Sequence, residues 1–293
     1  QVHSGIPTYL NLEAEFIEAD IRDRDQLRKV LRKVDVVSHQ AAVVGVGQSM
    51  YEIARYVDVN TLGTAILLEL IAGDPQITVE KLVIAGSMSA YGEGSYFCKS
   101  CKKERNPSLR QESQLSNHKW EHRCGDCGEV LEPKPTSEDK PLQTTSTYAQ
   151  TKKDQEELSL MVGKAYDVPT VVLRYFNVYG PRQSLNNPYT GVCAIFASRI
   201  NNERPPVIFE DGMQSRDLIH VTDIARANER AIDSEGVNSF GVFNVGTGRP
   251  RTIQSVCDLL IEHAGQEGRL APQICNQFRK GDIRHCFADI SKI

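Results

Sequence analysis

The apolar stretches in the first half of the chain alternate between two patterns. Residues 34–42 and 81–87 are short, nearly continuous apolar runs that end in small or hydroxyl-bearing side chains, as buried strands do. Residues 27–31 and 51–72 instead repeat apolar positions with the period of an amphipathic helix. Strands that alternate with helices pair in parallel through right-handed crossovers. The pattern therefore predicts an α/β fold with a doubly wound parallel sheet, whose ligands bind at the carboxyl ends of the strands.

The same patterning extends the predicted fold in both directions. Residues 14–20 alternate like a strand. Gly63 lies inside a helical run, where glycine costs about 1 kcal/mol relative to alanine, so a close packing contact is the expected compensation. A second long helix begins near Tyr148 and leads into a strand at residues 170–177. Further strands are expected at residues 207–209, 218–221 and 243–246, and further helices at residues 192–200, from Asp223 and after Thr252.

Residues 93–139 interrupt this alternation. The segment is polar, contains two Cys-x-x-Cys pairs and closes with the proline-containing run 132–135, so it is predicted to be an insertion into the parent fold. The periodicity becomes looser beyond Gly180. We therefore expect a sheet domain at residues 1–180 and a smaller C-terminal lobe at residues 181–293, with the chain crossing between the two.

Composition and charge exclude several classes of protein. The 293 residues are 40% hydrophobic, which is enough for a sizeable core, and the formal net charge is −4. No long basic run occurs, which argues against nucleic acid or an anionic membrane surface as a partner. No apolar run approaches the roughly 20 residues that span a bilayer, and the first residues lack a signal-peptide pattern. These features indicate a cytoplasmic protein.

The helix that begins near Tyr148 carries the first candidate for chemistry. Residues four apart share a helix face, so the Tyr148 hydroxyl and the Lys152 ammonium can converge on one point. A positive charge close to a phenol favours the phenolate, which could take a proton from a sugar or steroid hydroxyl while hydride leaves the same carbon. Tyr-x-x-x-Lys alone is a weak signal, because both residues are common on solvated helix surfaces. The interpretation depends on partner residues elsewhere in the chain.

The eight cysteines divide into two groups. Cys98 with Cys101 and Cys124 with Cys127 form two knuckles that have the spacing of a zinc ribbon with four thiolate ligands. Four thiolates leave no open coordination position, so the zinc would be structural rather than catalytic. The alternatives are four reduced cysteines in a flexible loop or a redox pair. The scattered cysteines are expected to be reduced and inert, namely Cys193, Cys257, Cys275 and Cys286.

Several short motifs stand in a fixed order along the chain: Asp20-Ile21, His39 to Ala42, Asn60 to Thr64, Ser87 to Gly92, Tyr148 to Lys152, Arg174 to Arg182 and Gly212 to Val221. Together they resemble the extended short-chain dehydrogenase/reductase superfamily, which includes NAD-dependent sugar-nucleotide epimerases and dehydratases. The resemblance covers nearly the whole chain outside the insertion. It implies a Rossmann-like fold with an NAD-binding domain at residues 1–180 and a substrate-binding lobe at residues 181–293.

The resemblance also implies roles for individual residues. Ser87 would hydrogen-bond the reacting hydroxyl, Tyr148 would be the acid and base, and Lys152 would hold the nicotinamide ribose and lower the pKa of Tyr148. Asn177 would bind the sugar nucleotide, and Arg216 its diphosphate, since a guanidinium pairs with phosphate in bidentate fashion. The alternative for Arg216 is an exposed arginine before a strand. The cofactor would further contact Asp20 and Ile21 at the adenine, Gln40, Ala41 and Ala42 along its central part, Asn60, and Phe176 at the nicotinamide.

Two departures from the family pattern affect the interpretation. The family's opening strand, Gly-x-x-Gly-x-x-Gly turn and helix do not occur, and Gln1 corresponds to the loop after the second strand. The resemblance therefore implies a fragment lacking its first βαβ unit, with much reduced NAD affinity. The family's 4,6-dehydratases carry Asp-Glu directly after the strand-end Ser or Thr, whereas this chain has Met88 and Ser89. Without those carboxyls, elimination of water lacks its acid and base, so 4-epimerisation by transient oxidation is the expected reaction.

The expected function is thus an NAD-dependent 4-epimerase of a sugar nucleotide. The cysteine-bearing loop is similar to that of a family branch that acts on dTDP-6-deoxyhexoses, and a UDP-hexose is the other expected substrate. The alternatives are a sugar-nucleotide reductase or decarboxylase of the same family, and a non-catalytic binding protein that uses the zinc ribbon as an interaction surface. The resemblance further implies a homodimer formed through the helices from Tyr51 and Tyr148. Within the insertion, Trp120 is expected to pack the ribbon, and His118 and His122 to be solvated.

Overall fold

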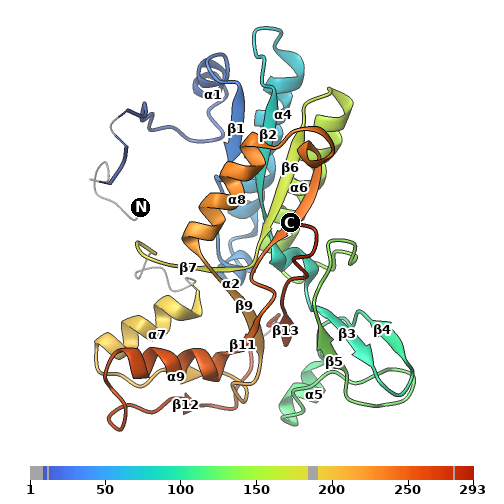
Figure 1. The fold of residues 1–293 in the computed structure, drawn as a ribbon, viewed down its shortest axis with the longest axis vertical. Helices are drawn as coiled ribbons and strands as arrows, with labels where there is room; N and C mark the ends of the chain where they lie inside the picture. Colours follow the sequence, from blue (N-terminus) through green and yellow to red (C-terminus); the bar gives the residue numbers. More distant parts are fainter. Residues whose placement is uncertain (1–8, 12, 184–190, 280) are drawn as a thin grey trace.

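A four-stranded parallel sheet forms the centre of the upper part of the molecule (Figure 1). In the computed structural model, which describes residues 9–11, 13–183, 191–279 and 281–293, its strand order is β1-β2-β6-β10. Every neighbouring pair is parallel, which confirms the predicted fold class. The last strand comes from the C-terminal part of the chain, so the chain crosses back to complete the sheet. The strands are β1 (Val36–His39), β2 (Lys81–Ser87), β6 (Thr170–Tyr175) and β10 (Gly241–Val245).

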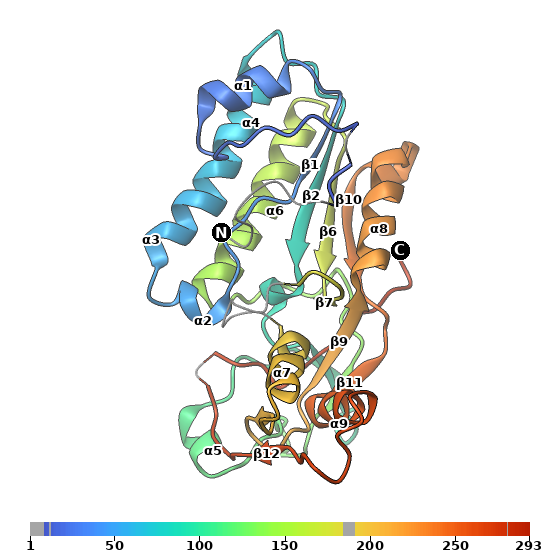
Figure 2. The same ribbon diagram turned by 90° about the vertical axis from the view of Figure 1, so that its left-hand side faces the viewer.

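Helices cover both faces of this sheet (Figure 2). The helices α1, α4 and α6 lie on one face and α8 on the other, which explains why β2 is apolar and buried along almost its whole length. Gly163 lets α6 approach β6 closely, because a Cβ atom there would lie 2.0 Å from Thr170 Oγ1. The helices are α1 (Arg24–Leu31), α4 (Gly63–Gly73), α6 (Thr147–Ala165) and α8 (Val221–Asp233).

The long helix expected in the first half of the chain is confirmed as one continuous helix, Ile53–Gly73. It contains an unpredicted π-helical stretch, Val57–Leu62, between α3 (Ile53–Tyr56) and α4. The close packing expected at Gly63 is present, because a Cβ atom there would lie 2.7 Å from Ile21 Cγ2. Contrary to the expectation from sequence, this helix is long and apolar enough to cross a membrane, alone among the described residues. Half of its apolar window is buried inside the fold, as in a core helix.

The strand expected at residues 14–20 is wrong. These residues are exposed, and none of them belongs to a strand of the described sheets. A strand depends on hydrogen bonds to a neighbouring strand, which an alternating pattern does not supply by itself. Phe16 consequently stays half exposed. Regular structure begins only at α1, where the Asp23 carboxylate caps the helix by accepting a hydrogen bond from Gln26 N at 3.1 Å.

A smaller lobe lies below the sheet and is organised around one strand, β9. The strands β7 and β13 pair with it in parallel, and β11 pairs with it antiparallel. Two helices and a two-stranded sheet complete the lobe, and Thr252 caps α9 as predicted. The elements are β7 (Asn177–Tyr179), α7 (Val192–Asn201), β8 (Val207–Ile208), β9 (Ser215–His220), β11 (Pro250–Thr252), α9 (Ile253–His263), β12 (Gln273–Ile274) and β13 (His285–Cys286).

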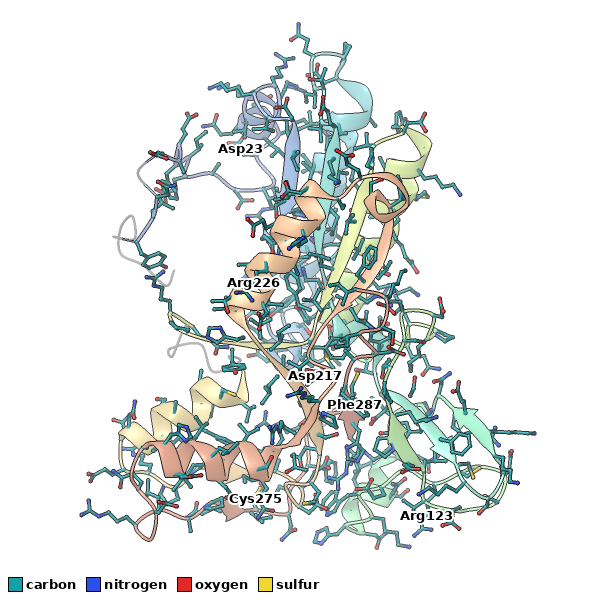
Figure 3. The ribbon with its side chains drawn as sticks, viewed as in Figure 1. Asp23, Arg123, Asp217, Arg226, Cys275 and Phe287 are labelled. Atoms are coloured by element: carbon teal, nitrogen blue, oxygen red, sulfur yellow. The ribbon has the colours of Figure 1, made fainter. Side chains whose placement is uncertain are left out.

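The strand β9 also connects the lobe to the upper layers. It runs directly into α8, whose N-cap residue is His220 rather than the predicted opening residue Asp223. Asp217 on β9 is fully buried, and its carboxylate accepts hydrogen bonds from Gly248 N and Ala288 N at 2.9 and 3.1 Å. Figure 3 shows Asp217 and Phe287 at the junction between the two parts of the molecule. This carboxylate therefore fixes the C-terminal segment against the strand that both parts share.

Residues 93–139 form an ordered unit at the side of the lobe (Figure 1). Trp120 is buried as expected, and the exposed ring of His118 stacks on it. The prediction that His122 is solvated is wrong, because it is buried with its Nε2 atom 3.0 Å from Glu93 Oε1. A carboxylate with no exposure needs such a partner. The unit comprises the antiparallel sheet β3 (Ser95–Cys98), β4 (Lys103–Arg105) and β5 (Glu132–Lys134), and helix α5 (Glu112–Ser116).

Candidate active site

A cavity of about 450 Å³ opens at the carboxyl ends of the central strands. Parallel α/β sheets bind ligands at this edge. The strand register brings Ser87 at the end of β2 next to Tyr175 at the end of β6. The first turns of α6 add Tyr148 and Lys152 to the same wall. The predicted site residues that line this cavity are Gln40, Ala42, Ser87, Tyr148, Lys152, Phe176 and Asn177.

Tyr148 is buried in the first turn of α6. Ser146 starts this helix by accepting a hydrogen bond from Ala149 N at 3.1 Å, and the Tyr148 ring packs edge-on against Tyr56. Burial raises the pKa of the Tyr148 phenol above its usual value, and hydrogen bonding with the Ser87 side chain partly opposes this rise. The lowering of this pKa that the sequence predicts is therefore outweighed, because removal from water disfavours the phenolate.

Lys152 is buried one helical turn beyond Tyr148. Its Nζ donates a hydrogen bond to Ala85 O at 2.8 Å, and burial lowers its pKa to about 8. Burial also lowers the pKa of His39 to about 4, with a smaller contribution from the Lys152 charge. No carboxylate opposes the shift of Lys152. The cavity thus contains an ammonium group with hydrogen-bonding capacity left for the hydroxyl groups of a ligand.

The residues expected along the central part of a cofactor lie where β1 ends. Gln40 and Ala42 line the cavity, whereas Ala41 between them is not part of its lining. Asn60 is fully buried outside the cavity, and its side chain bonds to both the N and the O of Val43, at 2.7 and 3.1 Å. Asn60 belongs to the π-helical stretch, a feature often found at functional sites. Its observed contacts order the loop that carries the lining residues.

Asp20 and Ile21 lie before α1 and are not among the residues that line the cavity at the end of the sheet. Asp20 forms an ion pair with Arg22 at 2.6 Å, and hydrogen bonding to Arg22 lowers the pKa of Asp20 to about 2. Ile21 packs against Gly63. The contact with adenine that the resemblance implies for both residues stays a prediction.

A second cavity, of about 280 Å³, lies in the lobe and shares Asn177 with the first. Arg216 lines it, as expected for a ligand of a diphosphate, and donates hydrogen bonds to the carbonyls of Ser215, Arg284 and Ile283. Arg216 is therefore partly buried and held in place, rather than an exposed arginine. The two cavities are therefore neighbours, with Asn177 in the lining of both.

Two further features of the second cavity were missed from the sequence. Arg279 lines it and lies over the Phe209 ring, 4.0 Å from its centroid. Within the described part of the chain, the Asn177 Oδ1 and Gln214 Oε1 atoms are buried without a hydrogen-bond partner, which fits a cavity that takes a polar ligand. Arg279 stands in an irregular segment without periodicity, so only its charge could have suggested it.

The four paired cysteines converge in the insertion. Their sulfur atoms all lie within 4.8 Å of one another, with Cys98 and Cys127 at 3.4 Å and Cys101 and Cys124 at 3.8 Å. Zinc–sulfur bonds of about 2.3 Å in a tetrahedral arrangement separate sulfurs by roughly 3.8 Å, so the donor set fits a zinc ion. None of the eight cysteines forms a disulfide bond with another described residue. None of the four converging cysteines lines the active-site cavity, which fits a structural ion.

Comparison with known proteins adds independent evidence. The model of the NAD dependent epimerase/dehydratase family matches residues 3–117 and 124–246. The chain is 31% identical over 296 residues to a dTDP-L-rhamnose 4-epimerase of Burkholderia thailandensis, a match that covers 100% of this chain and 78% of that protein.

Solved structures agree with the sequence comparison. The fold is similar to that of the UDP-glucose 4-epimerase of Thermotoga maritima with UDP-glucose, at a TM-score of 0.77 and 29% identity over 99% of this chain and 80% of that one. It is also similar to the UDP-glucose 4-epimerase of Thermus thermophilus in complex with NAD, at a TM-score of 0.73 and 29% identity over 98% and 79% of the two chains. With its parallel sheet, its Ser-Tyr-Lys cavity and a family match over most of its length, the chain belongs to the NAD dependent epimerase/dehydratase family.

Proposed function

We propose that this protein is an NAD-dependent sugar-nucleotide 4-epimerase. The observation that carries the proposal is a single cavity at the ligand-binding edge of the sheet that brings together Ser87, Tyr148 and Lys152. The similar proteins named above are 4-epimerases, and two of their structures contain NAD or UDP-glucose. Bound NAD would accept a hydride from the sugar C4 and return it to the opposite face.

The chain's own residues would handle the proton and the position of the sugar. Tyr148 Oη takes the proton of the C4 hydroxyl as the hydride leaves, and gives it back after the 4-keto sugar has turned over in the cavity. Ser87 Oγ, which lies 2.8 Å from Ser89 Oγ, holds the same hydroxyl. Lys152, oriented by Ala85 O, holds the nicotinamide ribose, and its positive charge stabilises the phenolate form of Tyr148 that accepts this proton. No net oxidation or reduction results.

The residues after the strand-end serine favour epimerisation over elimination of water. Met88 packs into an apolar cluster with Tyr91 and Phe176, and the Ser89 hydroxyl is bonded to Ser87. Neither side chain carries a carboxyl group. The acid and base that a 4,6-dehydratase uses at C5 and C6 are therefore missing at positions 88 and 89.

The two cavities suggest that the cofactor and the nucleotide part of the substrate bind in different parts of the molecule. NAD binds the domain at residues 1–180, and the lobe at residues 181–293 holds the nucleotide part of a dTDP-6-deoxyhexose or UDP-hexose. Arg216 pairs with the diphosphate, and Asn177, which lines both cavities, contacts the sugar nucleotide between them. The proposed cofactor contacts are Asp20, Ile21, Gln40, Ala41, Ala42, Asn60, Tyr148, Lys152 and Phe176.

We further propose that the protein binds a structural zinc ion and forms a homodimer. A structural zinc ion bound by the four converging cysteines makes the insertion a zinc ribbon, supported by the spacing of their sulfur atoms. The protein is a cytoplasmic homodimer that pairs through the helices after Tyr51 and Tyr148. Apolar side chains exposed on those helices, such as Val57 and Met161, support the assembly.

The decisive experiment follows the stereochemistry at C4. Purified protein supplied with NAD and either UDP-glucose or a dTDP-6-deoxyhexose is expected to produce a mixture of both C4 epimers, detected by proton NMR, without accumulation of NADH. Tyr148→Phe should slow this by a factor of about 10² or more, because the acid and base is lost. Tyr166→Phe is the matched control, since Tyr166 is exposed at the end of the same helix.

The other outcomes identify the alternatives. Net consumption of NADH during turnover would indicate a reductase, and net release of NADH an oxidative decarboxylase. An inactive protein that still binds NAD and zinc would indicate a non-catalytic binding protein. Unchanged activity of Tyr148→Phe would exclude the proposed mechanism.

A further inference from the structure

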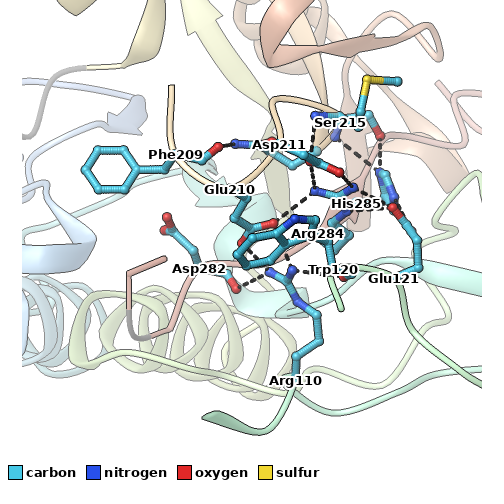
Figure 4. A network of polar contacts seen from close by, with 12 residues as sticks. Arg110, Trp120, Glu121, Phe209, Glu210, Asp211, Ser215, Asp282, Arg284 and His285 are labelled. Carbon is cyan, nitrogen blue, oxygen red and sulfur yellow. Dashed lines mark hydrogen bonds and ion pairs between the residues drawn. The ribbon is translucent and has the colours of Figure 1, made fainter. Parts of the chain in front are cut away.

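A buried ionic network joins the insertion to the lobe (Figure 4). Its centre is Glu210, which is buried and lines the cavity of the lobe. The backbone of Glu210 is left-handed, with φ at 54°, a conformation that is unfavourable for a non-glycine residue. Such a residue persists only where its surroundings hold it. The shape of this wall of the cavity therefore depends on the partners of Glu210.

Arg110 is the partner that the insertion supplies. Its guanidinium donates to both carboxylate oxygens of Glu210, at 2.9 and 2.8 Å, and to Asp282 O at 3.1 Å. Glu210 and Asp282 both line the cavity of the lobe. A further bond, to Trp120 O at 3.0 Å, anchors Arg110 within the insertion. The Arg110 side chain is only 1% exposed, so water does not compete for these bonds.

Arg284 extends the network toward the arginine expected to bind a diphosphate. Arg284 donates to Glu210 and, through Nε, to Glu121 of the insertion, each at 2.9 Å. The carbonyls of Arg284 and Ile283 accept hydrogen bonds from Arg216, at 3.0 and 2.7 Å. A continuous set of bonds thus runs from the insertion to the Arg216 guanidinium.

We propose that Arg110 is a positioning residue for the nucleotide-binding cavity. By holding Glu210 and the Asp282 carbonyl, it fixes the wall that carries Phe209 and the carbonyls that orient Arg216. The insertion then belongs to the substrate site, although none of its residues lines the cavity. The inference rests on the proposed function, because it assumes that this cavity takes a nucleoside diphosphate.

The charges in the cavity agree with this assignment of roles. Arg216 donates to carbonyl groups and Arg279 lies over an aromatic ring, and among the described residues neither forms a salt bridge with a carboxylate. Asp282 lines the same cavity, and both guanidinium charges act on its carboxyl group. Both guanidinium groups remain available to an anionic ligand. Arg110, in contrast, is neutralised by the bidentate pair with Glu210 and is not a ligand itself.

The test uses the protein's single tryptophan as a reporter. UDP and dTDP are titrated into the full chain, with affinity measured by calorimetry and Trp120 emission recorded in parallel. In the wild-type protein, binding is expected to change Trp120 emission, because the Trp120 carbonyl shares Arg110 with the cavity wall. Arg110→Met should weaken nucleotide binding about tenfold and abolish the emission change, and Arg110→Lys should restore part of both. In turnover, the loss should appear in KM, with kcat within about twofold.

Controls separate positioning from general loss of structure. Arg105→Met removes an arginine whose ion pair, with Asp126, stays within the insertion, so nucleotide affinity should not change. Thermal melts and zinc content confirm that each variant is folded. Should Arg110→Met fail to fold, Arg110→Gln keeps a hydrogen-bond donor but loses the charge and the bidentate pair with Glu210, and it should shift affinity in the same direction.

Each outcome has a distinct meaning. Equal nucleotide affinity in the wild-type protein and in a folded Arg110→Met or Arg110→Gln variant would overturn the positioning role and leave the proposed function intact. Absence of UDP and dTDP binding by the wild-type protein would overturn both.

Discussion

Lys152 is a cation that the fold buries without a carboxylate partner among the described residues, and its protonation is linked to stability. Burial lowers its pKa from the usual 10.5 to about 8. Between these two values the unfolded chain binds more protons than the folded protein, so the free energy of unfolding should rise with pH across this window. Below pH 8 the ammonium is charged in both states, and the full cost of burying it is present.

Removing this cation should therefore make the protein more stable and less active. Lys152→Met is expected to raise the free energy of unfolding at pH 7 by on the order of 1 kcal/mol, while epimerisation is largely lost. The gain should shrink as the pH rises from 8 toward 10.5. Thermal melts at pH 7 and pH 10 measure the effect, with Lys153→Met at the adjacent, partly exposed lysine as control. A Lys152→Met protein that melts lower at pH 7 would contradict this account.

Sequence spacing was sufficient to predict which candidate catalytic side chains meet, but not how their surroundings act on them. Tyr148 and Lys152 share one helix face, and Ser87 ends the neighbouring strand, so all three line one cavity as expected. The rise in the pKa of Tyr148 comes from burial by residues distant in sequence, which spacing cannot reveal. His122 was assigned to solvent for the same reason, since its partner Glu93 is packed against it only in the folded insertion.

Among helices and strands, those that pack on both sides were the most predictable. The strand β2 is predicted by its own continuous apolar run, which is buried, and the start of α6 is predicted by its own capping residue, Ser146. The run at residues 14–20 has the alternation of a strand but no neighbour to pair with. The π-helical stretch Val57–Leu62 was not predictable, because its register follows from the contacts of Asn60 with the loop after β1.

The insertion supplies a prediction about metal content. Elemental analysis of the purified protein should give about one zinc ion per chain, since four converging thiolates complete a tetrahedral site. Cys124→Ser should lose the metal and lower the melting temperature, because binding of the ion stabilises the two knuckles. Cys275→Ser, at a single cysteine in the lobe, should keep it. Protein that is folded and free of zinc would refute the ribbon.

At the scale of the whole molecule, the proposed homodimer can be tested by changing an exposed apolar residue on one of two neighbouring helices. Val57, Leu62 and Met161 are apolar and exposed on the helices α3–α4 and α6, which pack side by side (Figure 2). Light scattering should give twice the chain mass of 32.7 kDa. Met161→Glu should shift the protein toward the monomer, because a charge is costly in an apolar interface. Met213→Glu, at an exposed methionine in the lobe, is the control, and a wild-type monomer would exclude the assembly.

The division of the chain at residue 180 is expected from periodicity, with the chain crossing between the two parts. The strand β10 and helix α8 lie after this boundary, yet they complete the upper sheet and its second face. Periodicity records where regular elements occur, but not which neighbour each strand selects. The boundary stays a prediction, and the pairing of β10 with β6 had to come from three-dimensional packing.

That pairing has a consequence for the durability of the enzyme. The chain leaves the sheet at Tyr175 and returns at Gly241 as the adjacent strand, so a peptide bond broken after α7 would yield two fragments with neighbouring places in one sheet. Five ladder positions between β6 and β10, together with the parallel pairing of β7 with β9, would hold the fragments together. A protease-nicked molecule should therefore run as two bands on a denaturing gel and as one species in native chromatography.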